Sequence, residues 1–539
     1  MLPYFILAIA FSAVTMWRIR LLVRFFQLEE YQNKRFLLWL RIERIRWLPN
    51  FWLIGFGIGT LLSFISLILS IESSILYLII WIIAAAIMAY TPPTKEVKKR
   101  FVATARAKRL LATAFILAIS LNCLSAILIE QGDNLLLMGI LGSIVVLCAP
   151  LLLPIANLAM YPVEATLRRG FIAKARRRLK EAQVVVIGIT GSYGKTSTKQ
   201  YLTHILSGRY KVISTPKSYN TLMGVCITIN NDLDPTAGYQ YFVCEMGAYV
   251  PGEIRRICEL TKPQMSIVIA VGPQHLERFG SLENIEKAKY EIVEGVPPNG
   301  ITAFNFDDER VRRMETRQYP QHRFGVSCST PPHPDARLIA ENIKHTKDGL
   351  LFDVTDRQTN ETRTFRTELV GLHNVTNILL ATVIALETGM KLSEIALRVT
   401  SLTPADHRLR RTTLPNGITM LDDAYNTNPV GAANALEVLG LYQEGRRVLV
   451  TPGMVELADI QDIENEKLGR AASRYCTDII LVGKKQTEPI AKGVLSTDFD
   501  PNHLLIVDTV QEAIDWYQAN LQSGDTILFL NDLADNYLR

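Results

Sequence analysis

The sequence predicts an N-terminal all-α transmembrane bundle of about five helices, followed by an α/β region with a doubly wound central domain and a smaller Rossmann-like C-terminal domain. Three observations predict this fold class. Long uncharged apolar runs crowd into residues 1–160 of the 539. Short β-type runs alternate with helical periods from about residue 182, and this alternation restarts near residue 402. We therefore expect three domains: 1–181, 182–401 and 402–539.

Apolar stretches in the first third are long enough to cross a bilayer, which takes roughly 20 apolar residues and about 17 at the least. Four of them span or nearly span it, and a fifth, at 2–17, is short. No basic segment precedes "LPYFILAIAFSAV". A signal peptide would begin with one, so we expect a reversed anchor instead. The four longer stretches are 51–70, 74–90, 112–129 and 135–160.

Basic residues alternate with these apolar stretches. Segments 18–50, 91–111 and 161–182 hold eight, seven and seven Lys plus Arg, whereas the turns "IESS" and "EQGDN" hold none. Positive charge stays on the cytoplasmic side of a membrane. The pattern predicts an N-terminus outside, five crossings of the plasma (inner) membrane, and everything after Lys180 in the cytoplasm. Solvated loops or nucleic-acid contacts would also be basic, but the alternation favours topology, and we expect no nucleic-acid partner.

Segment 18–50 mixes Arg with Leu, Phe and Trp and is predicted to lie along the anionic inner leaflet as an interfacial helix. No charged residue is expected within a span, so nothing indicates an ion pathway. The bundle is interpreted as an anchor, or as a surface that meets a lipid substrate. The seven cysteines are scattered without a CxxC pair. This argues against disulfides and metal clusters and favours a reducing compartment for the soluble part.

The stretch "GITGSYGKTSTKQ", which starts at residue 188, follows the apolar run 184–187. Glycines at 191 and 194 let backbone N–H groups turn toward phosphates. Lys195 would reach the β- and γ-phosphates, and Thr196 would hold a magnesium ion. These features predict a P-loop in the central domain. The generic motif has glycine where this chain has Ile189. A chance glycine turn is the alternative, and the Lys-Thr pair behind a strand argues against it.

"TGSYGKT" without that first glycine resembles the Mur ligase family, the ATP-dependent amide-forming ligases of peptidoglycan assembly. Further motifs follow in the family's order, over roughly residues 182–525. The forms EMGA…PGEI and DDAYNxNP are most similar to the MurF-type branch, which adds D-alanyl-D-alanine. The motifs are "CEMGAYVPGEI" (244–254), "VGPQHLERFGSLENIEKAKYEI" (271–292), "NFDD" (305–308), "GLHNVTN" (371–377), "DDAYNTNP" (422–429) and "GMVEL" (453–457).

The resemblance implies that ATP converts a carboxylate into an acyl phosphate, which an amine then attacks. Charge builds on phosphoryl oxygens in such a reaction, so cations stabilise it. The resemblance implies ATP and two magnesium ions as cofactors. Their ligands would be Thr196, Glu245, His275 and Lys289. Glu245 ends a strand-like run and offers an oxygen ligand. His275 rests on the resemblance alone, because magnesium prefers oxygen.

Lys289 matches a lysine that family members carry as a carbamate. Carbamylation would turn a cation into a carboxylate-like metal bridge. The alternative is a surface helix lysine paired with Glu286 or Glu291. The family motif favours the carbamate.

The resemblance assigns two further groups of residues. Arg408 stands where the family has Gly-Arg and would contact the γ-phosphate; together with Lys195, Lys289, His275 and Glu245 it completes the catalytic set. His407 replaces the family's glycine there. The nucleotide-binding set is Thr190, Gly191, Ser192, Gly194, Lys195, Thr196, Asn305, His373, Asn374, Asn377, Asp423 and Tyr425.

Strand-like runs divide the soluble part into two sheets. Five of them precede residue 310 and predict a mainly parallel sheet with ATP at the carboxyl ends of its strands. Segment 335–370 is expected to be a small antiparallel insertion. Five more runs follow residue 402, and a hinge near "SLTPADHR" would let the two halves close on ATP. The ten runs are "VVVIGIT", "KVIST", "YQYFVCE", "MSIVIAV", "GITAFNF", "GITMLDD", "RRVLVTPG", "DIILVG", "LLIVD" and "DTILFL".

Two departures from the family concern the substrates. Membrane helices take the place of the soluble domain that grips the UDP-sugar precursor. The C-terminal "KGS" loop of the MurF type is replaced by "NDLADNYLR". We therefore expect a membrane-anchored ligase, in contact with membrane lipids, that joins an amino acid or dipeptide to a cell-envelope precursor with or without a lipid link.

Two alternatives remain. An amidating ligase would use ammonia on a lipid-linked precursor, although the branch that does so carries a zinc ribbon and this chain has no paired cysteines. A nucleotide-gated transporter or a non-catalytic ATP-binding scaffold is disfavoured, since Lys195, Thr196, Glu245, His275 and Lys289 all remain.

Overall fold

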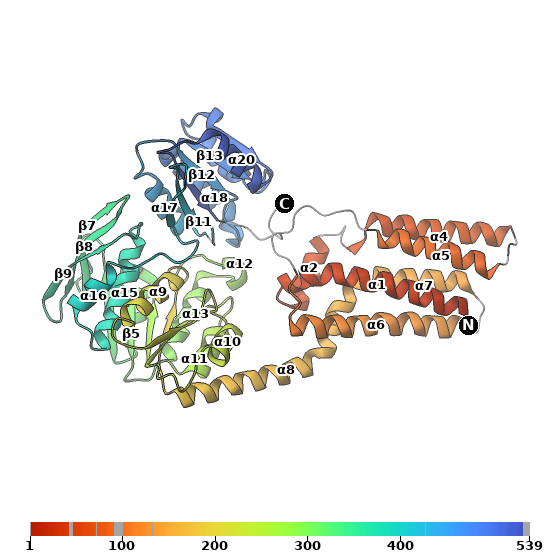
Figure 1. The fold of residues 1–539 in the computed structure, drawn as a ribbon, viewed down its shortest axis with the longest axis horizontal. Helices are drawn as coiled ribbons and strands as arrows, with labels where there is room; N and C mark the ends of the chain where they lie inside the picture. The colour runs from red at the N-terminus through yellow and green to blue at the C-terminus, as the bar shows by residue number, and fades with distance from the viewer. Residues whose placement is uncertain are drawn as a thin grey trace. The chain divides into compact units, whose positions relative to one another are not determined.

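The computed structural model describes residues 2–42, 47–69, 71, 73–90, 101–130, 134–425 and 427–531. The chain divides into two compact units, Met1–Gly170 and Phe171–Arg539. The first is all-helical, and the second holds two β-sheets with their helices (Figure 1). The second unit begins within a helix, before the boundary expected at residue 182.

Apolar helices make up the first unit. Among the described residues, three are long and apolar enough to cross a membrane (α1, α4 and α6), or four if the bent pair α7–α8 counts as one span. The predicted crossing at 74–90 corresponds to α5, a shorter apolar helix of 16 residues. The helices are α1 (Leu2–Leu28), α2 (Asn33–Ile42), α4 (Asn50–Ile68), α5 (Ser74–Ala89), α6 (Ala105–Glu130), α7 (Leu135–Leu147) and α8 (Ala149–Ala182).

Helix α1 is longer than the short span predicted at 2–17, and it includes the first part of the predicted interfacial segment 18–50. Beyond Arg18 its buried face continues with Ile19, Leu22 and Phe26, at the three- to four-residue spacing of a helix. The basic residues interrupt the hydrophobicity but not the helical period. Within that segment, the described residues Asn33–Ile42 form a separate helix, α2, with Arg41 in its last turn. The basic loop 91–100 lies outside the described residues.

The predicted span 135–160 is broken rather than continuous, because α7 and α8 meet at an angle of 65°. Pro150 has no N–H and cannot donate to the carbonyl of Val146. Nη1 of Arg18 donates to that oxygen instead, at 2.7 Å, and to Leu147 O at 3.4 Å. Arg18 is 7% exposed inside the bundle. Arg18 lies just beyond the predicted span 2–17, but within the longer helix α1.

The last turns of α8 belong to the second unit. Ala175 is buried in its core, and Nε of Arg178 donates to the carbonyls of Ile229 and Leu233 at 3.1 Å each. Ile229 lies in the last turn of α10 (Leu222–Asn231), and Leu233 lies two residues beyond its end, so Arg178 caps that helix end.

The larger sheet has nine strands in the order β2-β3-β1-β4-β5-β6-β7-β8-β9. The six strands β1 to β6 are parallel to one another, so their carboxyl ends share one edge of the sheet. All five runs predicted here form strands. The sixth parallel strand, β6 (His322–Ser327), was not predicted. The others are β1 (Val185–Thr190), β2 (Val212–Ser214), β3 (Tyr241–Glu245), β4 (Met265–Val268) and β5 (Ile301–Asn305).

The predicted antiparallel segment 335–370 forms β7 (Leu338–Thr346), β8 (Gly349–Asp356) and β9 (Glu361–Thr367), and its pairing is antiparallel as expected. It is not a separate insertion, because Val326 of β6 pairs with Leu338 in parallel and the strands extend the same sheet. The helices around this sheet are α9 (Lys195–Leu206), α10 (Leu222–Asn231), α11 (Glu253–Thr261), α12 (Leu276–Phe279), α13 (Leu282–Glu294), α14 (Glu309–Glu315), α15 (His373–Glu387) and α16 (Leu392–Val399).

The smaller sheet has six strands in the order β10-β11-β15-β12-β13-β14. The five predicted runs pair in parallel, and β10 (Arg410–Thr413) adds an antiparallel edge. Buried clusters lie on both faces of it. The elements are β11 (Thr419–Asp423), α17 (Pro429–Leu439), β12 (Arg447–Thr451), α18 (Gln461–Tyr475), β13 (Asp478–Val482), α19 (Glu488–Leu495), β14 (Leu504–Val507), α20 (Val510–Asn520) and β15 (Thr526–Leu530).

Candidate active site

The glycine-rich turn joins β1 to α9, as the sequence predicted. Gly194 has a φ of +81°, and a Cβ there would lie 2.7 Å from Oδ1 of Asn377. Both facts require glycine. Thr190 donates from Oγ1 to Met246 O at 2.8 Å. Ser192 donates to Gly272 O at 3.0 Å. These two hydroxyl groups thus fix the turn to the segments that follow β3 and β4.

Lys195 begins α9, and its side chain turns back over the loop. Nζ donates to the carbonyl oxygens of Gly191 at 2.7 Å and Ser192 at 3.2 Å. Burial lowers the pKa of this amine to about 8, although the Glu245 carboxylate works in the opposite direction. A bound anion would raise this pKa again, so the loop is suited to phosphate.

Glu245, at the end of β3, is 1% exposed. Its Oε2 accepts hydrogen bonds from Thr196 Oγ1 at 3.0 Å and Lys199 Nζ at 3.1 Å, and its Oε1 accepts from Asn220 Nδ2 at 3.0 Å. Burial by itself would raise the pKa of this carboxyl. The ammonium groups of Lys199 and Lys195 outweigh burial and lower it, so Glu245 is an anion.

Among the described residues no group of three or more His, Cys, Asp and Glu side chains is placed to hold a metal ion. Magnesium does not require such a group. It binds through one or two carboxylates and keeps waters and phosphate oxygens as its other ligands. The adjacent oxygens of Thr196 and Glu245 fit this pattern.

His275 precedes α12 with a φ of +56°. Its ring lies edge-on to Tyr249, with 4.8 Å between the ring centroids. Nδ1 is hydrogen-bonded to Oε2 of Glu456, whose Oε1 accepts from Arg278 Nη2 at 2.8 Å. Burial lowers the pKa of His275, opposed by Glu456.

Lys289 lies on α13 and is 3% exposed. Nζ is 5.8 Å from the centroid of the Phe279 ring. Burial first, and then the charge of Lys195, lower its pKa well below the ordinary value, although Glu253 and Glu291 oppose them. The alternative of a solvated surface lysine does not fit this burial.

The predicted nucleotide residues separate into two groups. His373 and Asn377 line the cavity described below, whereas Asn374 and Asn305 do not. Asn374 accepts from Tyr201 OH at 2.8 Å and donates to Val370 O at 2.8 Å. Asn305 donates to Ile269 O at 3.0 Å. These two amides hold the backbone around the loop.

Three predicted residues come from the C-terminal part, where Arg408 precedes β10, Asp423 ends β11 and Tyr425 follows it. The guanidinium of Arg408 lies 4.4 Å from the ring centroid of Tyr425. Oδ1 of Asp423 accepts from the Leu409 N–H at 3.1 Å. Burial raises the pKa of Asp423 to about 6, against the opposing charge of Arg408.

One cavity of about 170 Å³ brings most of these residues together. Lys289, Thr190 and Gly191 do not line it, but Lys289 is close enough to Lys195 for their charges to interact. The lining includes Ser192, Gly194, Lys195, Thr196, Glu245, His275, His373 and Asn377 from the first sheet and its helices, and Arg408, Asp423 and Tyr425 from the C-terminal part.

Sequence reasoning gave no role to four residues that shape the site. Lys199 and Asn220 bind Glu245, and Glu456 and Tyr249 contact His275. Lys199 could have been found from its i+4 spacing to Lys195 on one helix face. Glu456 lies within the "GMVEL" motif, but only the fold shows its partner.

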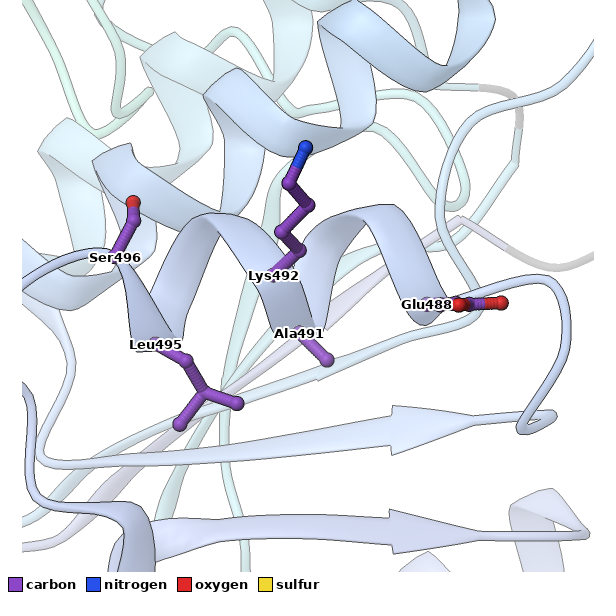
Figure 2. Close-up of a pocket in the computed structure, with 5 residues that line it drawn as sticks. All are labelled: Glu488, Ala491, Lys492, Leu495 and Ser496. Atoms are coloured by element: carbon purple, nitrogen blue, oxygen red, sulfur yellow. The ribbon is translucent and has the colours of Figure 1, made fainter.

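A second hollow runs along α19, and Figure 2 shows the side chains that line it. Two of its three polar side chains have partners within the chain. Lys492 Nζ lies 3.2 Å from Glu466 Oε2, and Ser496 Oγ donates to Gly493 O at 2.7 Å. The cavity at the glycine turn is therefore the better candidate for chemistry.

Comparisons with known proteins identify the domains that contain this cavity. The Mur ligase middle domain matches residues 189–385, and the Mur ligase glutamate ligase domain matches residues 407–531. The UDP-N-acetylmuramoyl-tripeptide–D-alanyl-D-alanine ligase of Bacillus subtilis (strain 168) is 26% identical over 356 residues, which cover 66% of this chain and 74% of that protein. The Escherichia coli (strain K12) ligase of the same name is 32% identical over 310 residues, covering 57% and 66%.

Solved structures show the same relationship. Crystal structure I of MurF from Acinetobacter baumannii is similar with a TM-score of 0.59 and 26% identity, covering 68% of this chain and 77% of that one. MurF ligase from Thermotoga maritima in complex with ADP shares the fold, with a TM-score of 0.60 at 23% identity, covering 69% and 81%.

Proposed function

Because it carries the middle and C-terminal domains of the Mur ligases, the chain belongs to the Mur ligase family, and we propose that it is a membrane-anchored enzyme of this family acting on a cell-envelope precursor. The enzyme is an ATP-dependent ligase. In the proposed reaction, ATP activates a carboxylate as an acyl phosphate, and an amino acid or dipeptide attacks it through its amine. The nucleophile displaces phosphate, and an amide bond forms.

The observation that carries the proposal is the meeting of opposite charges from two domains at one cavity. Lys195 and Arg408 are its cations, and Glu245 and Asp423 its carboxyl groups. The two cations would stabilise charge that builds on phosphoryl oxygens. Lys195 would exchange its backbone acceptors for phosphate oxygens as the nucleotide enters. Since Arg408 and Asp423 come from the C-terminal part, closure would also exclude water.

Thr196 and Glu245 would hold one magnesium ion, and His275 with Lys289 a second. The ions would neutralise phosphate charge when bound. Lys289 would take part as a carbamate: its neutral amine adds to CO₂ and loses a proton, which yields a carboxylate on Nζ. The lowered pKa supports this, because only the unprotonated amine can react.

For the substrates, we propose chemical classes and not individual compounds. By their names, the relatives join D-alanyl-D-alanine to UDP-N-acetylmuramoyl-tripeptide. Neither matched domain reaches residues before 189, where this chain has apolar helices. We propose an amino acid or dipeptide as the amine substrate and an envelope precursor, held at the inner leaflet and lipid-linked, as the acceptor.

The membrane arrangement is proposed from the helices and the distribution of basic residues. Five apolar helices, an N-terminus outside and cytoplasmic catalytic domains agree with the positive-inside rule. Cysteine-accessibility labelling tests it: a cysteine introduced at Leu2 should react with an impermeant reagent in intact cells. A cysteine introduced at the exposed Lys484 should react only after lysis.

The activity test uses full-length protein in detergent, with ATP, magnesium, and a panel of acceptors and amines that includes ammonia. Formation of ADP and phosphate that depends on both acceptor and amine would support the proposal. Turnover with ammonia alone would favour the amidating ligase. Nucleotide binding without turnover for every pair would favour a scaffold. Mass spectrometry of precursors that accumulate on depletion identifies candidate acceptors.

A further inference from the structure

Glu456 lies after β12 in the C-terminal sheet, yet its contacts are with the segment that follows β4 in the first sheet. Its carboxylate binds Arg278 and His275, and its carbonyl accepts from the N–H of Glu277 at 3.3 Å. The side chain is 11% exposed. This is an interdomain contact with partners for both carboxylate oxygens.

The carboxylate contact determines which nitrogen of His275 is available. An ionised carboxylate can only accept hydrogen bonds, so it holds a proton on Nδ1. In a neutral imidazole the lone pair is then on Nε2. Histidines that bind metals commonly donate their other ring N–H to a carboxylate, which fixes the tautomer and the direction of the ring. His275 lines the cavity and Glu456 does not, so Glu456 occupies the outer position in such an arrangement.

The surroundings of His275 restrict the ring further. The residue is in the left-handed backbone region, at a φ of +56°, where non-glycine residues need support from their contacts. Tyr249 lies edge-on to the ring on one side. The guanidinium of Arg278 lies 4.3 Å from the Tyr249 ring centroid and also binds Glu456. The four side chains thus hold one another, with only Glu456 coming from the C-terminal domain.

We infer that Glu456 is a positioning residue of the divalent-metal site, which orients His275 so that Nε2 is its ligand atom. Because Glu456 belongs to the C-terminal domain, this site is complete only when that domain is closed on the first. Metal affinity and domain closure are then coupled. The inference rests on the proposed role of His275 as a metal ligand.

The test measures Mn²⁺ binding to the full-length protein in detergent with ADP, by the electron paramagnetic resonance signal of free Mn²⁺. Glu456→Ala should weaken Mn²⁺ binding about 10- to 100-fold. Glu456→Gln, which keeps an acceptor oxygen, should weaken it less. The matched control is Glu444→Ala. It removes another interdomain ion pair, in which Oε2 of Glu444 lies 3.2 Å from Nζ of Lys347, and it should leave Mn²⁺ affinity unchanged. If the Glu456 and Glu444 variants lost Mn²⁺ affinity equally, Glu456 would act only as an interdomain contact, and the inference would be wrong.

A double-mutant cycle with His275→Ala separates positioning from mere packing. If Glu456 acts through His275, adding Glu456→Ala to His275→Ala should change Mn²⁺ affinity less than about twofold. Additive losses would overturn the inference. If His275→Ala itself binds Mn²⁺ as the wild type does, the proposed metal site fails. If only the Glu456 variants bind normally, the site stands and the inference fails. Should Glu456→Ala not fold, Glu456→Gln replaces it in the cycle.

Discussion

Nδ1 of His407 lies 2.7 Å from Oδ2 of Asp422, and this contact accompanies a left-handed backbone at His407, with a φ of +55°. The family pattern has glycine at this position, which adopts that region without strain. Here histidine adopts it too, and the next residue, Arg408, lines the cavity. The backbone geometry that glycine would provide is therefore kept.

His407→Ala should lower the free energy of unfolding by about 1 kcal/mol, because it removes the contact to Asp422 and keeps the strained backbone. His407→Gly also removes the contact but relieves a strain of about 1–2 kcal/mol. We expect glycine to be about as stable as histidine in thermal melts. A glycine variant less stable than the alanine variant would contradict the account.

Lys195→Ala should reduce kcat for ADP formation at least about 100-fold, since it removes a cation from the site of phosphoryl charge. The melting temperature should change little or rise, because the variant removes a buried amine whose pKa is lowered to about 8. Lys195→Arg is the control, because it keeps the positive charge but not the shape of the lysine side chain. Undiminished turnover in Lys195→Ala would exclude the glycine turn as the ATP site.

Lys289→Met should abolish activity and raise the melting temperature. With its pKa lowered by burial, the folded state binds fewer protons here than the unfolded state at every pH between the lowered value and the ordinary one. Stability of the wild type therefore rises with pH across that window, and the advantage of the Met variant shrinks. Melts in CO₂-free buffer from pH 6 to 10 check this. ¹³CO₂ should give a carbamate NMR signal only with Lys289 present.

Asp423→Asn should stabilise the protein above pH 6 and have little effect near pH 4. The folded-state pKa of about 6 lies above the unfolded value, so the wild type loses stability as pH rises between the two. Asparagine keeps an acceptor for the Leu409 N–H. The gain at pH 7.5 should be at most about 3 kcal/mol, at roughly 1.4 kcal/mol per unit of pKa. Denaturant titrations at both pH values measure it.

Arg18→Met should destabilise the helical bundle by about 1–3 kcal/mol, the cost of leaving buried carbonyl groups without a donor. The carbonyls of Val146 and Leu147 would lose their partner at the break before α8. Arg20→Met is the matched control, because Arg20 is exposed on the same helix. Unfolding in detergent, followed by circular dichroism, compares the two. Equal stability of both variants would show that the break needs no donor.

Strand-like runs were sufficient to predict strands β1 to β5 and β11 to β15. Apolar runs could not predict how far α1 extends, because Arg18 interrupts hydrophobicity but finds its acceptors at Val146 and Leu147, far along the chain. The break before α8 was missed for the same reason. Proline is common near the start of a helix, so Pro150 did not indicate a break. The donor that replaces its missing N–H is Arg18, far away in the sequence.

Motifs predicted the residues nearest the phosphate loop better than those around it. Lys195, Thr196 and Glu245 depend on local strand–turn–helix geometry, which a motif records. Asn374 and Asn305 match family positions, but their side chains bond within the protein: Asn374 accepts from Tyr201, and Asn305 donates to the carbonyl of Ile269. Glu456 contacts His275 across a separation of 181 residues, so only the packing of two domains shows the pair.

Lys195 donates to two carbonyl oxygens of its own turn, Gly191 O and Ser192 O. In the proposed site, entry of a triphosphate would exchange these two acceptors for phosphate oxygens, so each phosphate contact would replace a bond already made. That exchange would lower the net affinity for nucleotide. The same two oxygens would accept from the ammonium again as the nucleotide leaves, which would ease product release, a step that limits turnover in many enzymes whose domains close on their substrates.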